Sequence, residues 1–195
     1  PVPDTNQEFF MGRRLLFLGP PGGGKGTQAK LVTRALGIPH ISTGDMLREA
    51  MESGSELGKR ASEYMVVGDL VPDDLVVALV EQRLGRDDAA GGYLLDGFPR
   101  NLRQAEILTE VVGDDAINTI IYLIVDEDEV VERLLKRAEI EGRSDDNEET
   151  IRHRIEVFHG ETEPLVSYYG DRVRRVEGTG SVEDIFCRIA CELAS

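Results

Sequence analysis

The residues best suited to chemistry lie in a glycine-rich segment near the N-terminus, Gly19-Pro-Pro-Gly-Gly-Gly-Lys-Gly-Thr27. The segment follows an apolar run at 14–18 that predicts a buried strand, and it opens a helical pattern at 25–36. Glycines let backbone N–H groups turn toward phosphate oxygens, and a helix N-terminus adds partial positive charge. Lys25 could reach the β and γ oxygens of a nucleotide, so this segment predicts a phosphate-binding loop.

A second candidate is Asp96, which ends the apolar segment 92–96. The carboxyl end of such a strand lies at the ligand edge of an open α/β sheet. There Asp96 could hold Mg²⁺, directly or through water, and Thr27 is a possible further contact to Mg²⁺ or phosphate. Strands often end in Asp, so this prediction depends on the loop beside it.

Charge narrows the possible partners. The chain has 195 residues with 22 Lys+Arg against 37 Asp+Glu, a net charge of −15, which argues against nucleic-acid and anionic-membrane surfaces. Hydrophobic residues at 41% and charged residues at 30% indicate a globular chain. No apolar run is long enough for a membrane span, and residues 1–12 show no signal-peptide pattern; we expect them to be an extension outside the fold.

Alternating short apolar runs and helical patterns predict a parallel α/β sheet with helices on both faces. The expected strands are 14–18, 38–41, 92–96, 119–125 and 172–176. The expected helices are 25–36, 43–66 with a break near 53–54, 73–85, 101–112, 127–140, 147–169 and 182–194. Cys187 and Cys191 share a helix face, and we expect them to be buried apolar residues in a reducing, cytoplasmic compartment.

Arginine outnumbers lysine by 18 to 4, which genome composition or salt adaptation could explain. A single arginine is ordinarily a solvated surface charge, and only a family pattern can show whether several converge on phosphates. Six are candidates for such convergence: Arg48, Arg100, Arg133, Arg137, Arg143 and Arg154.

Five segments together resemble the adenylate kinase family of nucleoside monophosphate kinases. They are 19–28, Ser42-Thr-Gly-Asp-Met-Leu-Arg48, Asp96-Gly-Phe-Pro-Arg100, Arg133-Leu-Leu-Lys-Arg137 and Gly142-Arg-Ser-Asp-Asp-Asn-Glu-Glu-Thr150. The resemblance covers the chain from about Arg13 to its end. Gly26 stands where phosphate-binding loops commonly have Ser or Thr, and this Lys-Gly-Thr variant is the family's own.

The resemblance implies a P-loop NTPase-type fold with a five-stranded parallel sheet and two small attached parts. The core would comprise 13–41, 72–135 and 147–195, with a helical monophosphate-binding lobe at 42–71 and a short lid at 136–146. Long-lid relatives sometimes hold zinc through four cysteines, and no cysteine lies in this lid, so no structural zinc is expected.

The resemblance also implies the reversible, Mg²⁺-dependent reaction of ATP with AMP to give two ADP, carried out by a cytoplasmic monomer that binds neither nucleic acid nor membrane. Residues implied in catalysis are Lys25, Arg100, Arg133, Arg137, Arg143 and Arg154. Residues implied in ATP binding are Gly22, Gly23, Gly24, Lys25, Gly26, Thr27, Arg133, Arg137 and Gly180. Residues implied in AMP binding are Thr43, Arg48, Asp69, Leu70, Val71, Gly97, Phe98, Arg100, Gln104, Arg143 and Arg154. For Asp69 the backbone, rather than the side chain, is expected to contribute.

The choice of monophosphate depends on two positions. Thr43 and Gln104 resemble the AMP enzymes, whereas relatives that act on UMP or CMP tend to carry Ala and Asn there. A UMP/CMP kinase of the same fold and a non-catalytic nucleotide-binding protein remain alternatives. With seven cations assigned to one cleft, 15 basic residues remain against 37 acidic ones, about −22 for the rest. An acidic protein can therefore still bind an anion, because net charge averages over a segregated distribution.

Overall fold

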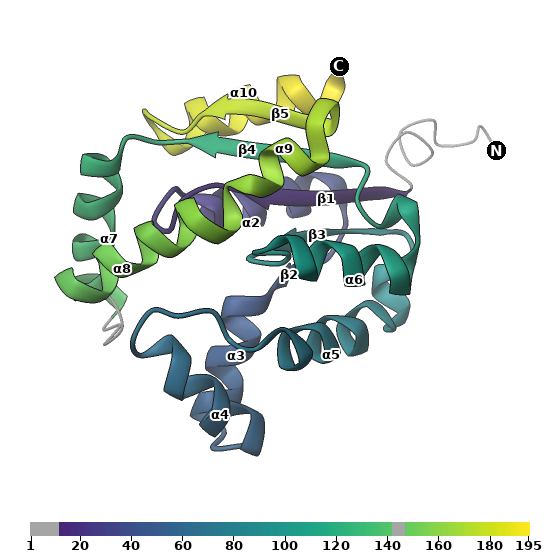
Figure 1. Cartoon of the computed structure of the whole chain (residues 1–195). Helices are drawn as coiled ribbons and strands as arrows, with labels where there is room; N and C mark the ends of the chain where they lie inside the picture. Colours follow the sequence, from purple (N-terminus) through teal and green to yellow (C-terminus); the bar gives the residue numbers. More distant parts are fainter. Residues whose placement is uncertain (1–11, 142–146) are drawn as a thin grey trace.

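The computed structural model describes residues 12–141 and 147–195. Its centre is one sheet of five parallel strands in the order β2-β3-β1-β4-β5 (Figure 1). The strands are β1 (Arg13–Leu18), β2 (His40–Ser42), β3 (Gly92–Asp96), β4 (Thr119–Ile124) and β5 (Val173–Glu177). The predicted α/β class is confirmed, and each strand begins and ends within two residues of its expected range.

The strand order places a topological switch point at β1. The chain runs from β1 to β2 and β3 on one side of it and then crosses to β4 and β5 on the other. In open parallel sheets, ligands bind outside the carboxyl ends of the strands at such a point. The glycine-rich loop follows β1 directly, so the fold places that loop where a ligand is expected.

Both faces of the sheet are covered, which explains the nearly continuous apolar strands. Leu16 and Leu18 of β1 join one buried cluster, whereas the alternating Leu15 and Phe17 join another on the opposite face. The second cluster is completed by α2 (Lys25–Leu36) and α10 (Val182–Ala194). The first is completed by α5 (Asp73–Leu84), α6 (Leu102–Val112) and α9 (Pro164–Tyr169).

Two helices, α3 (Thr43–Glu52) and α4 (Glu56–Met65), extend away from the sheet as a separate group (Figure 1). The predicted break between them is confirmed at Gly54, whose φ of 67° suits a residue without a side chain. The helices pack very closely, since a Cβ on Gly58 would lie 2.0 Å from the Ala50 carbonyl oxygen.

The expected single helix over 147–169 is wrong in its details. The structure has α8 (Glu148–Val157), a π-helical turn (Phe158–Thr162) and then α9. Pro164 starts α9 at a position where its missing N–H is tolerated. Short 3₁₀ turns at 87–89, 114–116 and 170–172 were not predicted either, since they carry no hydrophobic period.

The prediction that Cys187 and Cys191 are buried is also wrong, since both are exposed. The buried stripe of α10 is formed by Ile185 and Ile189, each two residues from a cysteine. Two residues of α-helix correspond to about 200° of rotation, so the cysteines share a face that is turned away from the core.

The π-helical turn is tied to α7 (Glu127–Glu141) through His159. Its Nδ1 lies 2.8 Å from Glu163 Oε2 and its Nε2 lies 2.9 Å from Glu127 Oε1. These carboxylates, Glu163 first, raise the pKa of His159 above its ordinary value.

We expect the substitution His159→Gln to destabilise the protein more at about pH 6 than at about pH 9. A raised pKa means that the protonated imidazole stabilises the fold below its ordinary pKa of about 6.5, and that this contribution is lost as pH rises through the raised value. Thermal unfolding of both proteins at the two pH values checks this. An equal difference in Tm at both would contradict it.

Candidate active site

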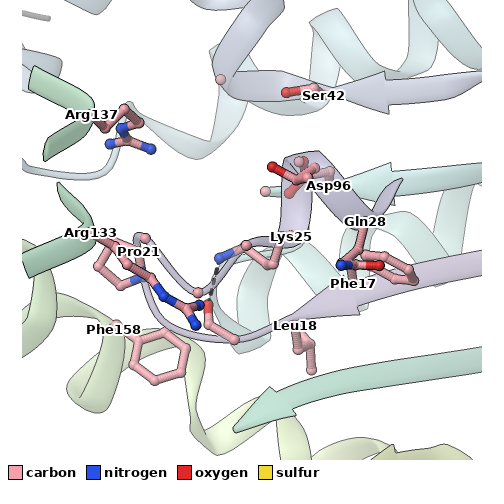
Figure 2. A pocket seen from close by; sticks show the side chains of 18 of the residues that line it. Phe17, Leu18, Pro21, Lys25, Gln28, Ser42, Asp96, Arg133, Arg137 and Phe158 are labelled. Carbon is pink, nitrogen blue, oxygen red and sulfur yellow. Dashed lines mark hydrogen bonds between the residues drawn. The ribbon is translucent and has the colours of Figure 1, made fainter. Parts of the chain in front are cut away.

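A cavity of about 580 Å³ lies at the carboxyl edge of β1 and β3 (Figure 2). The glycine-rich loop and the start of α2 form its floor, and α7 and α8 contribute side chains to its wall. Its lining includes predicted residues from 22–27 and from 96–100, together with Gly180. The fold therefore brings together motifs that are far apart in the sequence.

The loop ends at the start of α2 in a form suited to an anion. The residue before the helix is Gly24, with φ of 85°, and no side chain in the described structure caps this terminus. Gly22 also has a positive φ of 74°, and a Cβ there would lie 2.7 Å from Leu134 Cγ. Backbone N–H groups and the helix dipole thus face the cavity without a competing side chain.

Lys25 lies at the base of the cavity and is held by the loop itself. Its Nζ donates hydrogen bonds to the carbonyl oxygens of Gly19, at 2.7 Å, and Pro20, at 2.8 Å (Figure 2). Burial of the ammonium lowers its pKa to about 8; the Asp96 carboxylate opposes this change, while Arg100 and Arg137 add to it. An anion in the cavity would favour the charged lysine again.

Asp96 ends β3 beside this lysine and is buried. Its Oδ2 lies 3.2 Å from His40 Nε2, a contact that was not predicted from the sequence. A Cβ on Gly26 would lie 3.6 Å from the same oxygen, so the absence of a side chain after Lys25 leaves room beside the carboxylate. Among the residues of β3, all of which the structure describes, Asp96 is the only acidic one.

Five predicted arginines line the same cavity. They are Arg48 of α3, Arg100 after β3, Arg133 and Arg137 of α7, and Arg154 of α8. The sixth, Arg143, lies outside the described residues, as does the 142–146 part of the predicted lid.

Nearby acceptors position three of these arginines. Arg48 pairs with Asp45 at 2.6 Å, Arg100 Nε donates to the Gly97 carbonyl at 2.9 Å, and Arg133 contacts Glu129 and the Gly178 carbonyl. Arg100 is exposed, and it lines both this cavity and the smaller one described below. Burial and the nearby Arg154 charge lower its pKa. Several positively charged guanidinium groups close together repel one another unless a bound anion neutralises them. The cavity is therefore suited to a highly charged anion.

A second, smaller cavity of about 60 Å³ adjoins the first between α3 and α6. Most of the residues predicted for a monophosphate line it: Thr43, Arg48, Asp69, Leu70, Val71, Gly97, Arg100, Gln104 and Arg154. Thr43 Oγ1 donates to the Gly97 carbonyl at 2.8 Å. Phe98 is also predicted, but it is 1% exposed and belongs to the core.

Comparison with known proteins agrees with this geometry. The family model described as adenylate kinase matches residues 17–174. An adenylate kinase of Thermobifida fusca is 50% identical over 186 residues, which cover 93% of this chain and 98% of the relative. Adenylate kinases of Corynebacterium urealyticum and Leptospira biflexa are 51% and 46% identical, covering 92% and 89% of this chain and 98% and 95% of the relatives.

The chain belongs to the adenylate kinase family. The resemblance predicted from the five motifs is thereby confirmed, and the chain is a phosphotransferase of that family. Within the described ranges 12–141 and 147–195, no helix is long and apolar enough to cross a membrane. The same ranges hold no cluster of three or more His, Cys, Asp or Glu side chains arranged for a metal.

Sequence reasoning missed other residues of this adenylate kinase site, and three of them carry basic side chains. Lys30 and Lys136 line the larger cavity, and His40 contacts Asp96. Lys136 lies between two predicted arginines of α7, so its position in the helix could have predicted that it lines the same cavity. His40 precedes the recognised Ser42 motif and carried no such signal, because its contact depends on the pairing of β2 with β3.

Proposed function

We propose that the chain transfers the γ-phosphoryl group of ATP reversibly to AMP, giving two ADP, with Mg²⁺ accompanying ATP. The observation that carries this is the arrangement of Lys25 and five arginines around one cavity at the switch point of the sheet. Two phosphate chains meeting end to end need such a concentration of cations, whereas a single bound phosphate does not.

In this proposal ATP occupies the larger cavity. The backbone of 22–27 and Lys25 cradle its phosphates, while Arg133 and Arg137 hold the transferring group from the α7 side. Gly180 lines the cavity beside Val182 and packs near the adenine ring.

AMP occupies the adjoining smaller cavity in this proposal. Thr43 and Gln104 face its base, the backbone of 69–71 lines the base or ribose, and Gly97 lies close by. Arg48, Arg100 and Arg154 meet the phosphate, with Arg143 completing the set from the lid. Both cavities share Arg48, Arg100 and Arg154, which supports a position of the AMP phosphate beside the ATP γ-phosphate.

The reaction needs no general base. A phosphate monoester has a second pKa near 6, so the AMP phosphate is already largely dianionic at neutral pH. The residues act by positioning the two nucleotides in line and by stabilising the charge that moves between them. Exclusion of water from this cleft protects ATP from hydrolysis.

Magnesium fits the residues present. Asp96 offers a buried carboxylate next to the phosphate loop, and Thr27 lines the same cavity with a hydroxyl. Mg²⁺ is commonly held by one or two carboxylates together with substrate phosphates and water, so a single acid is sufficient. When bound, the ion neutralises phosphate charge and fixes its geometry; Asp96 would hold it, directly or through water.

A panel of monophosphates tests the function. We expect ADP formation from ATP with AMP well above that with UMP or CMP, and its loss when Mg²⁺ is removed. Preference for UMP or CMP would indicate the pyrimidine enzyme, and binding of both nucleotides without turnover would indicate a non-catalytic protein. The proposal also includes a cytoplasmic location, with which the free thiols of Cys187 and Cys191 agree. We further propose that the protein is a monomer with a monophosphate-binding lobe at 42–71 and a lid at 136–146.

The substitution Gln104→Ala is expected to raise KM for AMP by about tenfold or more while leaving ATP affinity nearly unchanged. Gln104 lines the smaller cavity and not the larger, and loss of hydrogen bonds in a buried pocket is costly. Steady-state kinetics with each substrate varied in turn measures both effects. Gln82→Ala, on the exposed side of α5, is the matched control. An equal loss for both nucleotides would contradict the placement.

A further inference from the structure

The side-chain amide of Gln104 is held at both of its ends. Its Oε1 accepts a hydrogen bond from the backbone N–H of Arg100 at 2.8 Å, and its Nε2 donates to Asp73 Oδ1 at 2.8 Å. Gln104 itself is 1% exposed, whereas Asp73 lies at the first position of α5 and is partly buried. The amide is therefore placed by groups from two different segments.

These two partners allow only one orientation of the amide. A backbone N–H can only donate, and an ionised carboxylate can only accept. With the amide turned over, Oε1 would face the carboxylate and Nε2 would face the N–H, so both contacts would become repulsive. The positions of oxygen and nitrogen in Gln104 are thus fixed by the chemistry of its neighbours.

Asp73 is in turn held in place. Asn101 Nδ2 donates to the same Asp73 oxygen at 3.1 Å, while Asn101 Oδ1 accepts from the backbone N–H of Gln104 at 2.8 Å and caps α6. The carboxylate also lies in the first turn of α5, where the helix dipole favours a negative charge. The three side chains form one bracket between α5 and α6.

The bracket leaves Gln104 one further N–H and one further oxygen lone pair. An adenine edge offers the matching pattern, with N1 as acceptor beside the exocyclic amine as donor. Hypoxanthine offers the reverse, with N1–H as donor beside O6 as acceptor. A fixed amide would therefore pair with adenine and reject hypoxanthine, whereas a freely turning amide could pair with either.

We propose that Asp73 is a specificity-determining positioning residue: its carboxylate fixes the orientation of the Gln104 amide and so selects adenine over bases with the reversed hydrogen-bonding edge. This inference rests on the proposed placement of AMP against Gln104. Asp73 lines neither cavity, so it acts through Gln104 rather than by touching the nucleotide.

The test compares AMP with IMP as phosphoryl acceptors, because the two differ chiefly at this edge of the base. We expect Asp73→Ala and the isosteric Asp73→Asn each to lower the AMP/IMP ratio of kcat/KM, by about tenfold for Ala and less for Asn, with KM for ATP unchanged. Asn retains an acceptor oxygen but can also donate, so it constrains the amide only partly.

Asp74→Ala and Asp74→Asn are the matched controls. Asp74 carries the same charge in the same turn of α5 but is exposed and outside the bracket. Equal loss of the ratio in the Asp73 and Asp74 variants would trace the effect to the helix charge and overturn the proposal. An unchanged ratio in both Asp73 variants, with a lowered ratio in Gln104→Ala, would also overturn it while leaving the AMP placement intact. An unchanged ratio in Gln104→Ala would refute the placement itself.

Discussion

Replacing Lys25 with Met is expected to lower kcat by a factor on the order of 10² or more. The lysine is the cation at the base of the phosphate loop, and its two hydrogen bonds to loop carbonyls hold the ammonium in the cavity. Methionine has a similar length and no charge, so it removes the electrostatic contribution with little change in volume. The stabilisation is needed most where charge builds up on the transferring group, so kcat should fall more than KM rises.

Initial rates of ADP formation at saturating ATP and AMP measure this effect. The matched control is Lys59→Met, which removes a lysine charge from exposed α4, outside both cavities. An unchanged far-ultraviolet circular dichroism spectrum would show that the variant is folded. Turnover close to that of the unmodified protein would contradict the role assigned to Lys25.

Much of the fold could be predicted because its signals are local. A strand buried on both faces must be apolar throughout, and β3 and most of β4 are buried along their length. The end of α2 was marked by Gly37, whose φ of 66° suits the residue after a helix. Such signals fix where elements begin and end without knowledge of what they contact.

The helical features that were mispredicted depend on packing instead. The 147–169 pattern is helical throughout, and nothing in its spacing indicates the π-helical turn at Phe158–Thr162. The cysteines of α10 were judged by residue type, yet the stripe set by Ile185 and Ile189 leaves them exposed. Periodicity was the better guide there than the usual preference of cysteine for the interior.

The candidate site also contains some residues that local sequence could predict and others that it could not. The glycine-rich loop is one continuous segment, so its residues and their spacing were enough to predict its position between β1 and α2. The arginines come from α3, α7, α8 and the segment after β3, and their convergence followed from the family resemblance and not from spacing. Contacts between His40 and Asp96, and between Asp73 and Gln104, join positions 56 and 31 residues apart; only the folded structure shows them.

Arg137→Ala is the second large effect, with kcat expected to fall by about 10² or more. Arg137 extends from α7 into the larger cavity on the same side as Arg133 (Figure 2). Its guanidinium can form two parallel hydrogen bonds to phosphate oxygens, which an ammonium cannot. Arg137→Lys should therefore recover only part of the loss. Single-turnover rates with bound ATP and AMP measure the chemical step, and Arg103→Ala on the exposed face of α6 is the control.

The neighbouring lysine allows the cause of this loss to be identified. Arg137 is one of the charges that lower the pKa of Lys25, so its removal moves that pKa back toward the ordinary value. Lys25 is then more fully protonated at neutral pH in the variant than in the unmodified protein. A discharged lysine is therefore not the expected cause of a fall in kcat, which we attribute to the missing guanidinium. Were the rate of Arg137→Ala restored by lowering the pH, protonation of Lys25 would be limiting and this assignment of Arg137 would be wrong.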